Sequence, residues 1–196
     1  MPTATEDRLV RCVWIGNDPL MLEYHDHEWG VPVHDDRKLF EFIVLSGAQA
    51  GLNWRTILRR RDAYREAFAD VDPIRIARFD QRKIDSLLHN DRIIRNRRKI
   101  EGAVQNARAY VALRQRVPSL DEFMWDFVGG KPIVNHWRTT AQIPASTPES
   151  DAMSKAMKKA GFTFFGTTIC YAHMQAVGMV NDHLVTCFRY RALTKR

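Results

Sequence analysis

The chain has 196 residues, and its 45% hydrophobic and 27% charged residues exclude a disordered protein and indicate one folded, soluble domain. Its 30 Lys and Arg residues against 23 Asp and Glu residues give a formal charge of +7, which favours a polyanionic partner such as nucleic acid, although a basic surface can also serve solubility alone. There is no apolar run of ~18 residues and no secretion leader, so we expect a cytoplasmic protein with no membrane partner. We also expect a monomer that folds as a single domain over residues 1–196, with residues 1–8 frayed.

The opening segment, residues 9–29, contains many turn-forming residues, and we expect it to be rich in loops. Three aromatic residues stand within it: Trp14, Tyr24 and Trp29. Cys12 also lies there, and the other cysteines of the chain are Cys170 and Cys187. Three cysteines are too few, and odd in number, for a disulfide framework, so a reducing compartment and thiolate–metal chemistry are favoured.

The rest of the first half has apolar residues at helical spacing and no alternation typical of strands. Asp35 or Asp36 begins a helix that extends to about residue 50, and Ser46 falls on or beside its apolar stripe. The pair Asp72-Pro73 is a helix start signal, with the aspartate as cap and the proline at the first helical position. Further helices are expected at residues 54–60, 62–69, 73–79 and 80–89.

In the second half, a long helix is expected from the segment 93–100 to about residue 114. Four basic residues lie in its first turns: Arg95, Arg97, Arg98 and Lys99. Helical hairpins that bind DNA direct the N-terminus of the second helix at a phosphate, because free N–H groups and the helix dipole favour an anion there. The cluster could bind DNA in this way, or it could be a solvated helix start. Other helices are expected at 120–127, from Ser150 or Asp151 to 160, and from Thr167 or Thr168 to 177, with a loop at 131–149.

A candidate metal site joins the two ends of the chain. His183 and Cys187 stand four residues apart, so on a helix they would share one face and could reach a single ion. A structural zinc takes four ligands, and the best remaining candidates are Cys12 and His25. The alternative is that these are two packed histidines and two inert thiols.

Four segments resemble the motifs of the 3-methyladenine DNA glycosylase I family: residues 24–32 (YHDHEWGVP), 49–54 (QAGLNW), 166–171 (GTTICY) and 181–183 (NDH). The resemblance covers about residues 11–190, with the motifs in the same order. It implies an all-α fold of the helix-hairpin-helix DNA glycosylase superfamily, with a structural zinc that ties the termini. The zinc ligands implied are the four named above, and His27 and Cys170 are not among them.

The resemblance implies a monofunctional enzyme that hydrolyses the N-glycosidic bond of 3-methyladenine in alkylated double-stranded DNA. The damaged nucleotide is flipped out of the stack, which costs less for a damaged pair. A base methylated at a ring nitrogen is a cation, so it is a good leaving group and is attracted to aromatic faces by ~0.5–2 kcal/mol per contact.

By the same resemblance, Trp54 stacks on the flipped base, Tyr24 forms a hydrogen bond with it, and Trp14 and Trp29 help to wall the pocket. Each aromatic residue taken singly is more often part of a core than of a ligand site. Leu52, which follows Gly51 at the break between two helices, matches the region that the family inserts into the DNA gap.

Two positions depart from the family pattern. Ser46 stands where a glutamate commonly recognises the base, and a hydroxyl has neither its charge nor its reach. Glu41 is about 140° away around an ideal helix and cannot replace that carboxylate, whereas Gln49, near the same face, could supply a polar contact. Arg92, in Asn90-Asp91-Arg92, replaces the usual glycine of the hairpin.

Three hypotheses follow from these departures. The chain is a 3-methyladenine glycosylase that tolerates Ser46, because a cationic leaving group demands less of the protein. Alternatively, it is an enzyme of the same fold with a different base preference, or a non-catalytic relative that binds a lesion or an abasic site. Ser46 is the residue that discriminates among the three.

Overall fold

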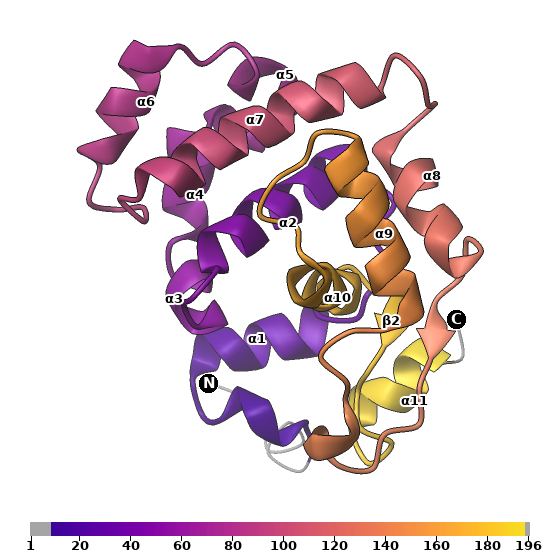
Figure 1. The fold of residues 1–196 in the computed structure, drawn as a ribbon. Helices are drawn as coiled ribbons and strands as arrows, with labels where there is room; N and C mark the ends of the chain where they lie inside the picture. The colour runs from indigo at the N-terminus through magenta and orange to yellow at the C-terminus, as the bar shows by residue number, and fades with distance from the viewer. Residues whose placement is uncertain (1–8, 195–196) are drawn as a thin grey trace.

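The computed structural model describes residues 9–194, and this part of the chain is mostly helical (Figure 1). The α-helices are α1 (Pro19–His27), α2 (Asp36–Gln49), α3 (Trp54–Leu58), α4 (Arg61–Ala67), α5 (Pro73–Ile76), α6 (Gln81–Leu88), α7 (Arg97–Leu113), α8 (Leu120–Trp125), α9 (Pro148–Lys159), α10 (Thr167–Ala176) and α11 (Phe188–Thr194). Four 3-10 turns are η2 (Val13–Ile15), η3 (Ala69–Val71), η4 (Asp126–Val128) and η5 (Thr140–Gln142). The strands β1 (Ile133–Val134) and β2 (Val180–Asn181) form one short parallel pair.

Helix α10 lies near the centre of the molecule, where Figure 1 shows it along its axis with α1, α2 and α9 around it. It packs against α9 and α2. Helix α7 packs against the other side of the fold, on α2, α5 and α6. Helix α2 is therefore shared by both halves, which explains why most of its residues from Leu39 to Ala48 are buried.

Helix α1 is not expected from the sequence, since residues 9–29 are predicted to be rich in loops. That prediction is wrong from Pro19 onward. The Asp18 carboxylate accepts a hydrogen bond from the Leu20 amide at 3.0 Å, and Pro19 occupies the first helical position. Asp72-Pro73 starts α5 by the same device, as predicted. The same signal was therefore present in both segments.

The segment 131–149 is more ordered than the predicted loop, because it contains β1, η5 and the start of α9. Helix α9 begins at Pro148 and not at Ser150 or Asp151. Thr147 is its cap, and the Ser150 hydroxyl accepts a hydrogen bond from the Thr147 amide at 2.9 Å, which completes a capping box. Within residues 9–194 no helix is both long and apolar enough to cross a bilayer.

Candidate functional site

A cavity of about 330 Å³ lies between α1, α2, α3, α10 and η5, and we call it the aromatic cavity. Its lining residues are Trp14, Tyr24, Trp29, Ser46, Gln49, Trp54, Thr140, Ile143, Ala172, Gln175 and Ala176. The structure thus brings together all six residues that were predicted to form a base pocket or act in it. Its volume falls at the small end of the range of ligand-binding cavities, roughly 300–1,000 Å³.

The aromatic side chains hold one another in fixed orientations. The Trp54 ring lies parallel to Phe42, with centroids 6.3 Å apart and 16° between the planes. Tyr24 contacts Trp54 at a centroid distance of 5.4 Å, and Trp14 meets Trp29 edge to face at 4.9 Å. These distances lie within the range of about 4.5–7 Å that is favourable for aromatic pairs, so the rings that line the cavity also pack against one another or against the core.

The lining of the aromatic cavity contains no charged side chain among the described residues. Burial raises the pKa of Tyr24, so its phenol stays protonated and can donate a hydrogen bond. Ser46 is only 4% exposed, which confirms that it lies on the buried side of α2. The cavity is therefore neutral, aromatic, and equipped with a few polar atoms.

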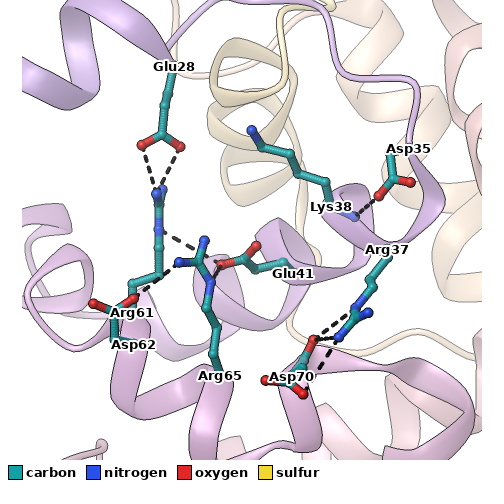
Figure 2. A network of polar contacts seen from close by, with 9 residues as sticks. All are labelled: Glu28, Asp35, Arg37, Lys38, Glu41, Arg61, Asp62, Arg65 and Asp70. Carbon is teal, nitrogen blue, oxygen red and sulfur yellow. Dashed lines mark hydrogen bonds and ion pairs between the residues drawn. The ribbon is translucent and has the colours of Figure 1, made fainter.

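Glu41 does not enter the aromatic cavity, as its angular separation from Ser46 predicts. Its carboxylate accepts a hydrogen bond from Arg65 Nε at 2.8 Å and lies 3.9 Å from Arg61 Nε (Figure 2). Arg61 Nη1 donates to both carboxylate oxygens of Glu28 at 2.8 Å. This chain of ion pairs joins the end of α1 to α2 and α4 behind the cavity.

The same guanidinium supports the cavity wall, because Arg61 Cζ lies 5.9 Å from the centre of the Tyr24 ring and 5.7 Å from that of Phe42. A buried cation would repel a cationic ligand, but the carboxylates of Glu28 and Glu41 neutralise this one. The network thus orients Tyr24 without adding positive charge to the site.

Five lining residues lie outside the predicted set: Thr140, Ile143, Ala172, Gln175 and Ala176. The first two come from the segment expected to be a loop, and the others from α10, whose apolar spacing indicates a core helix. Gln175 could have been suspected from the sequence, because it is a polar residue on a mostly apolar helix. Its Nε2 donates to Asp182 Oδ2 at 2.8 Å.

Asp182 is buried, with 1% of its surface exposed, and its carboxylate receives four hydrogen bonds. Oδ1 accepts from Asn135 Nδ2 at 2.7 Å and from Trp137 Nε1 at 2.8 Å. Oδ2 accepts from the Tyr171 hydroxyl at 2.6 Å and from Gln175 Nε2 at 2.8 Å. A carboxylate can accept about four hydrogen bonds. All of its acceptor sites are therefore satisfied by protein donors.

Cys12, His25, His183 and Cys187 form a group that could hold a metal ion, which we call the Cys2His2 group. One ligand atom from each lies within 4.8 Å of the others, and all four residues are buried. Cys187 Sγ is 3.5 Å from His25 Nε2 and from His183 Nδ1, and Cys12 Sγ is 3.7 Å from His183 Nδ1. Ligand atoms around a tetrahedral zinc are separated by about 3.3–3.8 Å, given Zn–N and Zn–S bond lengths of about 2.0–2.3 Å.

The structure corrects one premise of the metal prediction: His183 and Cys187 do not share a helix. Residues 183–187 form a turn, closed by a hydrogen bond from the Cys187 amide to the Leu184 carbonyl at 2.7 Å, and α11 starts only at Phe188. A turn brings residues four apart together as effectively as a helix does. The two side chains do lie together, but a turn and not a shared helix face brings them there.

Both histidines of the group have their other ring nitrogen bound to an oxygen. His25 Nδ1 lies 2.7 Å from Asp26 Oδ1, and His183 Nε2 lies 3.0 Å from the Trp29 carbonyl. Burial alone would raise the pKa of Asp26, but hydrogen bonds from Arg11 and His25 lower it. Such partners fix the orientation of metal-binding imidazoles.

The two thiols of the group also influence each other. Their mutual hydrogen bond raises the pKa of Cys12 and lowers the pKa of Cys187. One thiolate is thus favoured even without a cation, and a bound divalent cation would favour both.

The residues predicted to contact DNA lie at two places. Gly51 (φ 74°) and Leu52 form the turn between α2 and α3, and Leu52 is 41% exposed, which is unusual for a leucine in this fold. Lys99 extends from α7 to this turn, where its Nζ donates to the Ala48 carbonyl at 2.8 Å and to the Ala50 carbonyl at 2.6 Å. Lys99 therefore caps the end of α2.

The other basic residues lie at the hairpin of α6 and α7. Arg95 and Arg98 are exposed and have no ion-pair partner within residues 9–194, whereas Arg97 pairs with Asp85 at 2.9 Å. Arg92, which replaces the hairpin glycine, pairs with Glu66 on α4. The φ angle of Arg92 is not positive, so the backbone of this hairpin does not require glycine at that position.

His173 is a further buried group, next to the aromatic cavity but not part of its lining. It is fully buried between Phe42 and Phe165, with ring centroids 6.4 Å and 5.1 Å away. Neither ring nitrogen has a well-formed hydrogen bond with the described residues. Burial lowers its pKa to about 3, against a smaller opposing effect of the Phe42 backbone.

Comparison with known families gives a consistent result. A family model described as methyladenine glycosylase matches residues 14–190. A relative in Escherichia coli (strain K12), DNA-3-methyladenine glycosylase 1, is 49% identical over 180 residues, which span 92% of this chain and 96% of the relative. A relative in Haemophilus influenzae (strain ATCC 51907 / DSM 11121 / KW20 / Rd), DNA-3-methyladenine glycosylase, is 48% identical over 90% of this chain and 96% of its own length.

Solved structures agree with these matches. A crystal structure of 3-methyladenine DNA glycosylase I superposes with a TM-score of 0.90 and 52% identity, over 91% of this chain and 98% of the other. The Staphylococcus aureus enzyme, solved to show how it recognises 3-methyladenine, superposes with a TM-score of 0.88 and 34% identity, over 91% and 95% of the two chains.

Proposed function

Because the chain belongs to the methyladenine glycosylase family, we propose that it is a base-excision repair enzyme that releases 3-methyladenine from alkylated duplex DNA. The observation that carries this proposal is the neutral aromatic cavity, in which Tyr24 and Trp54 are among the lining residues. Related proteins are named for this activity, which favours a glycosylase over a non-catalytic relative.

The reaction suits the chemistry of the cavity. Water adds to C1′ of the flipped nucleotide while the C1′–N9 bond breaks, and the bonding electrons leave with the base and neutralise its charge. The attacking water releases a proton to solvent. Aromatic walls bind the cationic base, with about 0.5–2 kcal/mol per contact, and the phenol of Tyr24 donates a hydrogen bond to it. Trp54 supplies the stacking surface.

The direct test is to identify the bases that the purified protein releases from methylated DNA. Chromatography should detect free 3-methyladenine above a protein-free control. Release of a different base would show that the enzyme has another base preference than the one proposed. If no base is released, the chain is not a glycosylase, whatever its family.

Ser46 is expected to make the enzyme weaker than relatives that carry a glutamate there. We predict that Ser46→Glu raises kcat/KM by roughly tenfold, since a hydrogen bond to a charged group contributes about 1.5–3 kcal/mol. Ser46→Gln is the matched control, with similar reach and no charge, and should raise kcat/KM by less. Equal activity of Ser46→Glu and the unmodified protein, both folded, would show that position 46 does not read the base.

We also propose that the Cys2His2 group holds one structural zinc. The donor set, the ligand spacing and the oxygen partners of both histidines support zinc. The ion would link residues near both ends of the chain and would supply no step of the hydrolysis. Elemental analysis of the purified protein should find one zinc per chain.

The DNA contacts proposed are the α6–α7 hairpin, as a helix-hairpin-helix element, and the α2–α3 turn. Arg95, just before α7, and Arg98, in its first turn, are exposed and form no ion pair with any residue from 9 to 194, so they suit contacts with phosphates. Leu52, on the turn after Gly51, is exposed where a wedge could fill the space left by a flipped nucleotide. A single domain working as a monomer suffices for this arrangement.

A further inference from the structure

The orientation of the Gln175 side chain is fixed by its neighbours. Asp182 offers only acceptors while ionised, and its two oxygens already accept from Asn135, Trp137 and Tyr171 in addition to Gln175. The amide of Gln175 must therefore present its NH2 group to Asp182, at 2.8 Å. Reversing the amide would place two oxygens against each other inside the protein, which is strongly unfavourable.

The carbonyl oxygen of the same amide has no partner in the part of the chain that the structure describes. Gln175 lines the aromatic cavity, and no hydrogen bond to its Oε1 is formed within residues 9–194. The other oxygen acceptors among the side chains of the lining are less restricted. Hydroxyl groups at Tyr24 and Ser46 can rotate, and the amide of Gln49 has no hydrogen bond to fix it in the described structure.

We propose that Gln175 Oε1 is the acceptor that reads the exocyclic amine of the flipped base, and that Asp182 is the positioning residue that aims it. This inference rests on the proposed function and refines it. A 6-aminopurine such as 3-methyladenine offers N–H donors to this oxygen. A 6-oxopurine such as 3-methylguanine offers an oxygen at the same place and would leave Gln175 facing another acceptor.

The proposal assigns part of the selectivity to a group that is not a carboxylate. No carboxylate lines the aromatic cavity in the described chain, and Ser46 cannot supply one. A fixed amide oxygen distinguishes a donor from an acceptor without depending on the charge of the ligand. A site built to satisfy a hydrogen bond rejects a ligand that leaves its polar group unpaired. The preference for a 6-aminopurine over a 6-oxopurine is therefore kept even if Ser46 weakens the binding of both.

The test compares two free bases of nearly equal size: 3-methyladenine, and 3-methylhypoxanthine, in which an oxygen replaces the amine. Binding is followed by the fluorescence of the cavity tryptophans. The unmodified protein should bind 3-methyladenine at least about tenfold more tightly, equal to ~1.4 kcal/mol. Gln175→Leu should reduce this ratio to about one, because it removes the acceptor and keeps the bulk.

Gln49→Leu is the matched control, since Gln49 lines the same cavity but has no fixed partner. It should weaken both bases alike and keep their ratio. Asp182→Asn, checked for metal content, should lower the ratio by freeing the Gln175 amide to turn. An unchanged ratio in folded Gln175→Leu would overturn the proposal.

The unmodified protein gives an independent result if the variants do not fold, because equal binding of the two bases would also overturn the proposal. The test of Gln175 and the test of the proposed function can fail independently. If the protein releases 3-methyladenine from DNA but binds the two free bases equally, only the proposed role of Gln175 is refuted. Failure to release any base removes the function itself.

Discussion

The Cys2His2 group and the aromatic cavity are linked by two consecutive residues, His183 of the group and Asp182, which binds Gln175 of the cavity lining, yet they differ in how their polar atoms are satisfied. In the group, each imidazole has its second nitrogen bound to an oxygen, from Asp26 or from the Trp29 carbonyl. In the cavity, the hydroxyls of Tyr24 and Ser46 have no hydrogen-bond partner within residues 9–194. In the first region the outer nitrogens of the imidazoles are satisfied within the protein, whereas the hydroxyls of the second remain available to a ligand.

This difference separates effects on stability from effects on activity. Changes in the Cys2His2 group should act on folding, and changes in the cavity should act on excision with the fold retained. Variants of the two regions should therefore differ in whether they lose stability or activity.

The largest effect is expected from Cys187→Ala. Loss of one ligand should release the zinc and reduce the free energy of unfolding by more than about 4 kcal/mol, as is typical when a structural metal is lost. Cys170→Ala is the control, because Cys170 is equally buried but lies outside the group. It should cost about 1 kcal/mol. Denaturant unfolding and zinc analysis measure both, and retained zinc and stability in Cys187→Ala would refute the assignment.

Trp54→Ala should reduce excision with little change in metal content. Stacking of one base on an aromatic side chain contributes about 1–3 kcal/mol, so kcat/KM should fall roughly 10- to 100-fold. Phe123→Ala removes a comparable ring from a separate groove near α8 and should leave excision unchanged while the protein is folded. Equal losses in both variants would mean that the cavity is not the site of reaction.

His173→Phe should stabilise the protein, because it removes a buried imidazole with no well-formed hydrogen bond in the described structure. The expected gain at pH 7 is about 1–3 kcal/mol. Urea unfolding measures it. A loss of stability would show that the imidazole has a partner in solution, such as a water molecule.

The gain from His173→Phe should grow as the pH falls. The pKa of His173 is about 3 when folded and ~6.5 in an unfolded chain. Below pH ~6.5 the unfolded state therefore binds a proton that the folded state does not, so stability declines toward pH 3. The Phe variant lacks this contribution, and equal gains at pH 7 and pH 5 would contradict the depressed pKa.

The smallest effects are expected at the α6–α7 hairpin. Arg95→Ala and Arg98→Ala should each weaken binding to DNA of any sequence and reduce the slope of log K against log salt by about 0.9. Arg97→Ala is the control, since Arg97 already pairs with Asp85 and should contribute less. Fluorescence anisotropy at several salt concentrations measures the slopes. If Arg97→Ala changes the salt slope more than Arg95→Ala does, the phosphate contact does not involve Arg95 as proposed.

The grouping of the two cysteines and two histidines, and the aromatic wall, could be predicted from the sequence because their chemistry is restricted. Few residue types bind zinc, and the family motifs name Tyr24 and Trp54 directly. The opposite wall could not be predicted, because Thr140 and Gln175 belong to segments whose composition indicates a loop and a core helix. Their position depends on how α10 packs between α2 and α9, which no local pattern encodes.

Helix α1 shows the converse case. Its start signal at Asp18-Pro19 is as clear as that at Asp72-Pro73, but the aromatic and turn-forming residues around it favoured a loop. Arg92 departs from the motif without straining the backbone, because its φ angle is not positive. Ser46 is a different matter, since it changes the chemistry of the cavity and not the fold.

The contact between Lys99 and the end of α2 has a mechanical consequence. Its ammonium holds the Ala48 and Ala50 carbonyls, just before the turn that carries Leu52. The first turn of α7, which contains the exposed Arg98 and follows the exposed Arg95, is therefore joined by two hydrogen bonds to the turn that exposes Leu52. In the DNA complex proposed above, any displacement of Leu52 away from the duplex would have to break or bend these two hydrogen bonds, which would favour distortion of the DNA over distortion of the turn.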